Sequence, residues 1–252
     1  MIRLRNVSKK YREKVVVDSV DLELPKNKII AFIGSNGAGK STLLSMIART
    51  LMRNSGDIFI DETHLNEWKS SELAKKLAIL KQSNHFNIRL TIRELVAFGR
   101  YPYSKGRLNQ EDNEAIDEAL AYMGLTDLQD RYLDELSGGQ RQLACIAMVI
   151  AQNTEYIFLD EPLNNLDMHH SVQIMKVLQR LVIEKGKTVM VVIHDINFVS
   201  YYAEHIIAMK HGKLVRSGSN EEMIRPEVLN DIYGMDINVQ EINGKNVCLY
   251  YE

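Results

Sequence analysis

One glycine-rich segment has the composition of a phosphate-binding loop. It consists of Gly34, Ser35, Asn36, Gly37, Ala38, Gly39, Lys40, Ser41 and Thr42. In such a loop, glycines let backbone N–H groups turn inward around a phosphate, and the N-terminus of the following helix adds donors. An apolar run ends at Ile33 and a helical run follows Thr42, which is the strand–loop–helix context that the motif requires. We therefore expect a nucleoside triphosphate site rather than an unliganded turn. Lys40 would contact the β- and γ-phosphates, and the Ser41 hydroxyl would bind Mg²⁺.

Two adjacent acids, Asp160 and Glu161, end a second apolar run at residues 156–159. Ligands of open α/β sheets bind at the carboxyl ends of the strands, which predicts that both acids lie beside the phosphate loop. Successive side chains of a strand point in opposite directions, so the two acids can have different roles. We expect Asp160 to bind Mg²⁺ and Glu161 to orient or deprotonate an attacking water. The alternative is that both acids cap the turn that follows them.

A third motif opens a helix. Ser137 is followed by Gly138, Gly139 and Gln140. Ser137 is a typical N-cap residue, and the two glycines expose backbone donors at the positive end of the helix. Taken alone, the pattern predicts an ordinary capped helix. In a chain that already has a phosphate loop, it predicts a second anion-binding site.

With this third motif, LSGGQ at residues 136–140, the chain resembles the ATP-binding subunits of ABC transporters, whose signature has this sequence. The resemblance covers essentially the whole chain, as a single cassette over residues 1–252. It implies that Gln82 senses Mg²⁺ and water, and that His194 contacts the γ-phosphate. It also implies that Tyr11 stacks on adenine and that Asp167 is the acid of the family's D-loop.

Each of these implied roles has a simpler alternative. Tyr11 would be a half-buried strand residue, His194 would cap the helix that starts near Asp195, and Gln82 would be a surface loop residue. The neighbouring pair His169 and His170 suggests a metal site at first sight. Because no companion ligand has the right spacing, we expect a solvated helix start there.

The family pairs two chains head to tail, so that each signature motif covers the nucleotide held by the other chain's phosphate loop. This chain has one phosphate loop and one signature motif. The resemblance therefore implies a homodimer, or a pair with a similar chain, with two composite sites that use ATP and Mg²⁺. ATP closes the dimer and hydrolysis reopens it, because the γ-phosphate supplies contacts that only the closed state makes.

The apolar runs at residues 28–33, 156–159 and 188–193 are strand-sized and lack polar alternation, which favours buried parallel strands. Helical patterns lie between them, as at residues 171–184, so we expect an α/β core with a mainly parallel sheet. Residues 3–7 and 15–24 alternate with a period of two and predict an added N-terminal antiparallel sheet. Residues 83–151 are expected to form a helical insert, with helices at 91–99, 111–123 and 138–152. Short strands and a helix near residues 220–225 follow.

Composition limits the classes of function. The chain has 252 residues, a formal net charge of −2 and 45% hydrophobic residues, which predicts a globular protein and argues against nucleic-acid or membrane-surface binding. Two cysteines cannot form a disulfide framework. No apolar run reaches the ~20 residues of a membrane helix, and the charged N-terminus has no signal-peptide core. We expect a peripheral protein that partner subunits hold at the cytoplasmic face of the membrane.

The segment FGRYPY at residues 98–103 resembles that of ATPases from iron–siderophore importers, especially those for catecholate siderophores such as petrobactin. In that group the helical insert contacts integral membrane permeases, and an extracytoplasmic binding protein delivers the siderophore. The alternative for residues 89–107 is a solvated basic loop.

The alternatives for the whole chain are the ATPase of a cobalamin or zinc/manganese importer, a non-transport ABC ATPase, and a nucleotide-binding module without turnover. Intact Lys40, Asp160, Glu161 and His194 argue against the last.

Overall fold

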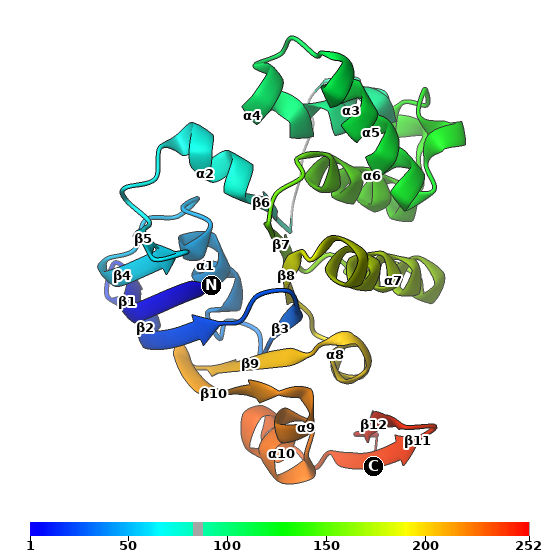
Figure 1. Ribbon diagram of the computed structural model, residues 1–252. Coiled ribbons are helices and arrows are strands. Elements are labelled where there is room, and N and C mark those ends of the chain that lie inside the picture. Colours follow the sequence, from blue (N-terminus) through cyan, green and yellow to red (C-terminus); the bar gives the residue numbers. More distant parts are fainter. Residues whose placement is uncertain (83–87, 252) are drawn as a thin grey trace. The chain divides into compact units, whose positions relative to one another are not determined.

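The computed structural model describes residues 1–82 and 88–251. The chain forms two compact units, and we describe each by itself (Figure 1). The first unit consists of Met1–Trp68 and Thr188–Glu252, and the second of Lys69–Lys187.

The N-terminal part of the first unit is an antiparallel sheet. It contains β1 (Ile2–Tyr11), β2 (Lys14–Leu24), β4 (Ser55–Ile60) and β5 (Thr63–His64) in the order β2-β1-β4-β5. Along β1, Ile2 and Leu4 are buried while Arg3 between them is half-buried, as the alternating pattern predicts. The expected N-terminal antiparallel sheet is therefore confirmed.

The core of the first unit is a mostly parallel sheet. Strand β3 (Ile29–Ile33) lies between β8 (Thr188–Val192) and β9 (His205–Lys210) and runs parallel to both. Strand β10 (Lys213–Ser219) adds an antiparallel edge beside β9. Every residue of β3 and β8 is buried, which explains why these runs lack polar alternation. Helix α1 (Lys40–Ile47) follows β3, and α8 (Ile196–Tyr202) follows β8.

The tail of the first unit contains α9 (Asn220–Met223), α10 (Pro226–Tyr233) and a hairpin of β11 (Asn238–Ile242) with β12 (Lys245–Leu249). The sequence predicted one helix near residues 220–225, and this prediction was incomplete. The chain leaves the helical conformation at Ile224 and Arg225, and Pro226 begins a second helix. Proline suits the first turn of a helix but cannot continue one.

The second unit combines two parallel strands with a group of helices (Figure 1). Helix α2 (Ser70–Lys76) leads into β6 (Leu77–Leu80), which pairs with β7 (Tyr156–Asp160). The remaining helices are α3 (Ile92–Ala97), α4 (Tyr101–Ser104), α5 (Gln110–Met123), α6 (Gly138–Ala151) and α7 (Met168–Lys185), with single 3₁₀ turns at Phe98–Arg100, Thr126–Leu128 and Leu133–Glu135.

The helical insert predicted for residues 83–151 corresponds to the stretch from α3 to α6. Its first residues, 83–87, lie outside the described part of the chain. The compact unit is wider than the insert, because it also includes the parallel strands β6 and β7 and helix α7. The predicted helix at residues 171–184 begins earlier, at Met168, because Asp167 caps it.

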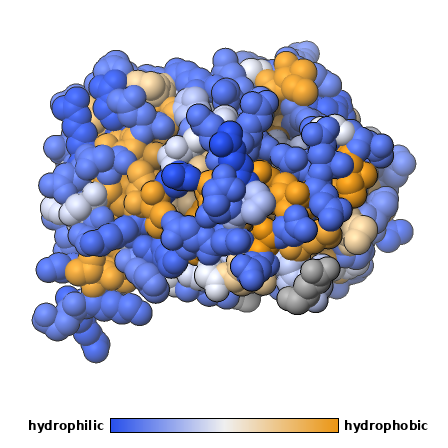
Figure 2. Space-filling view, turned by 90° about the horizontal axis from the view of Figure 1, so that it is seen from below, coloured by the Kyte–Doolittle hydropathy of each residue, from blue (hydrophilic) through white to orange (hydrophobic). Residues whose placement is uncertain are grey.

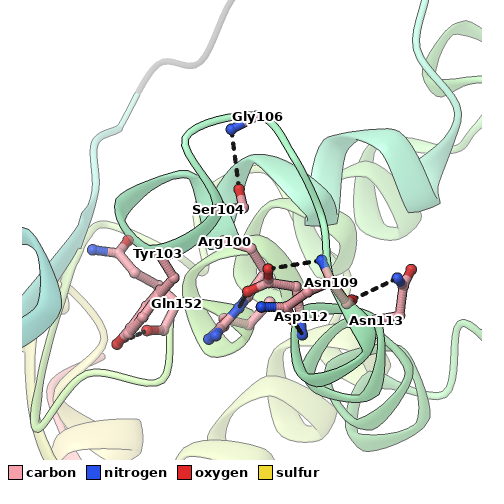
Figure 3. Close-up of polar contacts among 9 residues, drawn as sticks. Arg100, Tyr103, Ser104, Gly106, Asn109, Asp112, Asn113 and Gln152 are labelled. Carbon is pink, nitrogen blue, oxygen red and sulfur yellow. Dashed lines mark hydrogen bonds and ion pairs between the residues drawn. The ribbon is translucent and has the colours of Figure 1, made fainter.

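A buried ion pair holds the FGRYPY segment in place (Figure 3). Arg100 Nε donates to Asp112 Oδ1 over 2.9 Å, and these side chains are 4% and 1% exposed. Arg100 Nη1 donates to the carbonyl of Ala151, and the Tyr103 hydroxyl donates to that of Gln152. The segment is thus fixed both to the first turn of α5 and to the end of α6. This contradicts the solvated-loop alternative for its residues 100 and 103.

In the described part of the chain, no helix combines the length and the apolar composition that a membrane span requires. The face drawn in Figure 2 is mainly hydrophilic, with hydrophobic residues in separate patches. Scattered apolar residues of this kind are normal on a protein surface.

Candidate functional site

The glycine-rich loop connects β3 to α1 as the sequence predicts. Its tip, Ser35 to Gly37, is exposed, whereas Gly34 and the residues from Ala38 to Lys40 are buried. The N-cap of α1 is Gly39, which has a positive φ of 100° and offers no side-chain hydrogen bond to the first turn. No acidic residue stands in that first turn. With no capping side chain at Gly39 and no acid in the first turn, the start of α1 is suited to an anion.

Glycine is required at both ends of this loop because other backbone segments approach it closely. A Cβ on Gly34, whose φ is +130°, would lie 2.0 Å from the carbonyl oxygen of Met209. A Cβ on Gly39 would lie 2.5 Å from the carbonyl oxygen of Val16. Both positions thus exclude a side chain by contact as well as by conformation.

Lys40 lies inside the loop, with only 5% of its surface exposed. Its Nζ donates to the carbonyl oxygens of Gly34 and Ser35 over 2.7 and 3.0 Å. These bonds hold the ammonium within the loop, where a phosphate surrounded by the same backbone would meet it. The geometry fits the triphosphate role expected for Lys40.

His194 reaches the same edge of the first unit as the loop. Phe32 of β3 pairs with Val192 of the parallel strand β8, so the loop and His194 both follow the carboxyl ends of neighbouring strands. His194 is exposed. It does not cap α8, because the N-cap is Asp195, whose carboxylate accepts from the N–H of Asn197. The capping alternative for His194 is therefore wrong.

Tyr11 ends β1 in the antiparallel sheet of the first unit, next to the turn that leads into β2. Its ring is 49% exposed, and Lys9 Nζ lies 5.2 Å from the ring centroid. An exposed aromatic face with a cation beside it can stack on a base.

In the second unit, Glu161 follows β7 and Gln82 follows β6, the parallel neighbour of β7. Gln82 Nε2 donates to Glu161 Oε2 over 2.6 Å, although 79 residues separate them. Asn164 Nδ2 donates to the same oxygen. Two amides from different segments therefore orient the carboxylate, and Gln82 is more than a surface loop residue. The contribution of Asn164 was missed, because its spacing from Glu161 is typical of any turn.

The backbone of Glu161 is in the left-handed region, with φ of 52°. This conformation is uncommon for residues other than glycine and stores ~1–3 kcal/mol of strain. Asp160, one residue earlier, is 8% exposed at the end of β7. The two acids therefore have different surroundings, although strand alternation is not the reason, because Glu161 lies beyond β7 and outside the extended conformation.

The signature motif forms the first turn of α6 in the second unit. Ser137 Oγ accepts from the N–H of Gln140 over 3.2 Å, and Gln140 Oε1 accepts from the N–H of Ser137 over 3.1 Å. This reciprocal arrangement is a capping box, so the prediction that Ser137 is an N-cap is confirmed.

Asp167 caps α7 in the same unit. Its carboxylate accepts from the backbone N–H of His170 over 2.8 Å and also contacts His170 Nδ1. These hydrogen bonds from His170 lower the pKa of Asp167. Asp167, His169 and His170 offer three ligand atoms within 4.8 Å of one another, so a companion acid does lie beside the histidines. The expectation that no companion ligand has the right spacing is therefore wrong, because the cap of α7 brings Asp167 against His170.

The side chains expected to hold Mg²⁺ have suitable chemistry. Ser41 offers a hydroxyl, Gln82 an amide oxygen and Asp160 a carboxylate, and oxygen ligands are those that Mg²⁺ prefers. Each of these side chains, Ser41 in the first unit and Gln82 and Asp160 in the second, therefore has the chemistry of a magnesium ligand.

The fold and these motifs define an ATP-binding cassette. Residues 17–164 match the model of the ABC transporter family, which is more than half of the chain. The chain therefore belongs to the ABC transporter family, as an ATP-binding ATPase subunit.

Curated proteins with high sequence identity to this chain are import ATP-binding proteins. The chain is 57% identical over 251 residues to the petrobactin import ATP-binding protein YclP of Bacillus subtilis (strain 168), with 100% of both chains covered. It is 50% identical over 239 residues to the petrobactin import ATP-binding protein FatE of Bacillus anthracis, covering 95% of this chain and 96% of that one. Among solved structures, the cassette MJ0796, a dimer bound to ADP and Pi in a post-hydrolysis state, has a TM-score of 0.78 at 31% identity. The similarity covers 87% of this chain and 99% of that one.

Proposed function

We propose that this chain hydrolyses ATP to power the import of a ferric siderophore of the petrobactin type. The siderophore would pass through integral membrane permease subunits at whose cytoplasmic face the chain is bound. The petrobactin-import relatives, which match over nearly the full length, support the transported class. The single observation that carries hydrolysis is the Glu161 carboxylate held by Gln82 over 2.6 Å.

The roles of the residues follow from their positions. The backbone of residues 34–42 surrounds the phosphates, Lys40 balances their charge, and Tyr11 stacks on adenine. Glu161 accepts a proton from the attacking water, which Gln82 and His194 help to place. Ser41, Asp160 and Gln82 hold Mg²⁺, which supplies charge neutralisation on the phosphates when bound.

A second copy of the cassette completes each site. Ser137, Gly138, Gly139, Gln140 and Asp167 act on the nucleotide bound by the partner chain's phosphate loop. Dimerisation of the relative MJ0796 supports this arrangement. The helical insert contacts the permease, and an extracytoplasmic binding protein delivers the siderophore to the permease without touching this chain. ATP closes the pair of cassettes and hydrolysis reopens it, which drives the permease through its cycle.

Replacement of Glu161 tests the hydrolytic role. Glu161→Gln keeps the size of the side chain and one acceptor oxygen for Gln82 and Asn164 but removes the base. We expect ATP binding to persist, turnover to fall by about 10²–10⁴-fold and an ATP-bound dimer to accumulate. Hydrolysis by the variant at the parent rate would contradict the role of Glu161.

Uptake of radioactive iron tests the transported class. Cells lacking the gene would receive iron as petrobactin or as a hydroxamate chelate, with complementation by the parent gene or by Glu161→Gln. Loss of petrobactin-bound iron uptake alone, restored only by the parent, would support the proposal. Loss of both would indicate an ATPase shared between permeases. Unchanged uptake of both would favour a cobalamin or zinc/manganese importer and leave the ATPase assignment intact.

A further inference from the structure

His170 joins two segments of the second unit that the sequence analysis treated separately. It is the third residue of α7, and its backbone N–H donates to Asp167 Oδ1. Its Nδ1 lies 2.9 Å from Oδ1 and 2.8 Å from Oδ2 of the same carboxylate. The Asp167 side chain is 63% exposed, whereas that of His170 is 23% exposed. The imidazole therefore adds a second contact to a largely exposed carboxylate that the backbone N–H of His170 also holds.

Besides an edge-on contact with the His169 ring, the His170 ring also contacts the signature motif. A Cβ built on Gly139 would lie 2.8 Å from both Cγ and Nδ1 of His170, and 2.9 Å from Cδ2. Nearly equal distances to three ring atoms mean that the face of the imidazole covers this glycine. Any larger residue at position 139 would displace the ring. The second glycine of the signature is thus required by a neighbour within its own chain.

A second link ties the same two segments together. Gln142 Nε2, one turn into α6, donates to the carbonyl oxygen of Pro162 over 3.0 Å. Pro162 belongs to the stretch between Glu161 and Asp167. The first turns of α6 are therefore joined at two points to the segment that runs from β7 into α7.

We propose that His170 is a positioning residue that fixes Asp167 and the signature turn to each other, so that both meet the partner cassette's nucleotide as one preformed surface. The inference rests on the proposed function, in which these residues act across the dimer. Preformed contacts avoid the cost of immobilising side chains on binding, ~0.5–1.5 kcal/mol for each. Removing the imidazole is expected to weaken closure of the dimer while leaving nucleotide binding to the chain's own phosphate loop intact.

Three replacements of His170 separate its two contacts. His170→Asn keeps a donor for Asp167 without the ring, His170→Phe keeps a ring on Gly139 without the donor, and His170→Ala removes both. Lys176→Ala, at an exposed position further along α7, is the matched control. Each change is made in full-length Glu161→Gln protein, so that ATP is bound without turnover.

Two measurements are made on every variant. Sedimentation follows the ATP concentration needed for half-maximal dimer, and a fluorescent ADP analogue reports binding to the monomer. We expect His170→Ala to raise the ATP concentration for half-maximal dimer by about tenfold. A tenfold change corresponds to the upper end of the free-energy cost of immobilising one side chain on binding. We expect His170→Asn and His170→Phe to recover part of the loss. Lys176→Ala should dimerise like the parent, and the ADP affinities of all variants should match that of the parent.

The inference fails if His170→Ala dimerises like the parent. It also fails if His170→Ala weakens ADP binding as much as dimerisation, because that result indicates a structural role alone. A Glu161→Gln parent that binds ATP but does not dimerise would overturn the proposed function, and the inference with it.

Discussion

The buried ion pair between Arg100 and Asp112 gives the sharpest test of how this cassette is held together. In Asp112→Asn the side chain keeps its shape and one acceptor oxygen, but Arg100 loses its counter-charge. Arg100 is 4% exposed; it also donates to the carbonyl of Ala151, and its guanidinium lies over the Tyr103 ring. Water therefore cannot replace the lost carboxylate without opening the packing between α5 and α6.

Removing one partner of a buried ion pair costs ~3–5 kcal/mol, because the other charge remains desolvated. Asp112 Oδ2 also accepts from the N–H of Asn109 in the capping box of α5, and the asparagine oxygen can keep one such bond. The loss should therefore come mainly from the uncompensated guanidinium. For a chain of this size we expect the melting temperature to fall by about 2–4 °C per kcal/mol.

Asp117→Asn is a matched control on the same helix. Asp117 pairs with Arg93, but its side chain is 62% exposed, and exposed pairs contribute ~0–1 kcal/mol. Urea unfolding would be followed by circular dichroism and by the fluorescence of Trp68, the single tryptophan, which belongs to the first unit. Transitions that differ between the two probes would show that the units unfold separately.

A double variant completes the test. Arg100→Met added to Asp112→Asn removes the buried charge, so it should recover part of the lost stability. A cost for Asp112→Asn below about 1 kcal/mol, equal to that of Asp117→Asn, would refute the reasoning.

Three further expectations concern buried groups. Burial raises the pKa of both thiols, Cys145 and Cys248, to about 11, so at pH 8 their thiolate population is about a hundredfold below that of ordinary cysteines. Native protein should react slowly with a thiol reagent and rapidly in guanidinium; fast reaction without denaturant would contradict this. Burial also raises the pKa of Tyr233 to about 12. Because the unfolded chain releases these protons at lower pH, stability is complete below about pH 9 and is lost as pH rises through 11–12; a constant urea midpoint over that range would argue against it. A Cβ on Gly99 would lie 2.1 Å from the carbonyl oxygen of Met148, so Gly99→Ala should lower the free energy of unfolding by about 1–3 kcal/mol, and an unshifted midpoint would disprove the contact.

Local patterns were enough to predict the buried strands and the glycine-rich loop. The predicted apolar runs correspond to β3, β7 and β8, and the ends of each run and its strand differ by one residue at most. The agreement is close because fully buried strands need apolar residues throughout. The N-cap at Ser137 was predicted from the motif alone, and the structure adds the reciprocal hydrogen bond of Gln140. Features encoded within one turn or one strand can be inferred without knowing the fold.

Contacts between distant segments could not be inferred in the same way. Nothing near Gln82 in the sequence indicates that its amide meets Glu161, since the contact depends on β6 lying beside β7. Arg100 and Asp112 look like ordinary surface charges in a polar stretch, and only the packing of α5 on α6 buries them. We expected His170 to be solvated. Its ring covers Gly139 of another helix, and no local sequence pattern indicates such a contact.

The left-handed backbone of Glu161 sets stability and activity against each other at one residue. Glycine adopts a φ of 52° without strain, so a cassette selected for stability alone would favour glycine at this position. Glycine has no carboxylate, and such a cassette could bind nucleotide but would have no base for the attacking water. The left-handed conformation of residue 161 destabilises the fold, yet it is the conformation in which the side chain meets Gln82 and Asn164. Screens that enrich stabilised variants of this protein should therefore be read together with turnover, because the two measurements rank residues at position 161 in opposite orders.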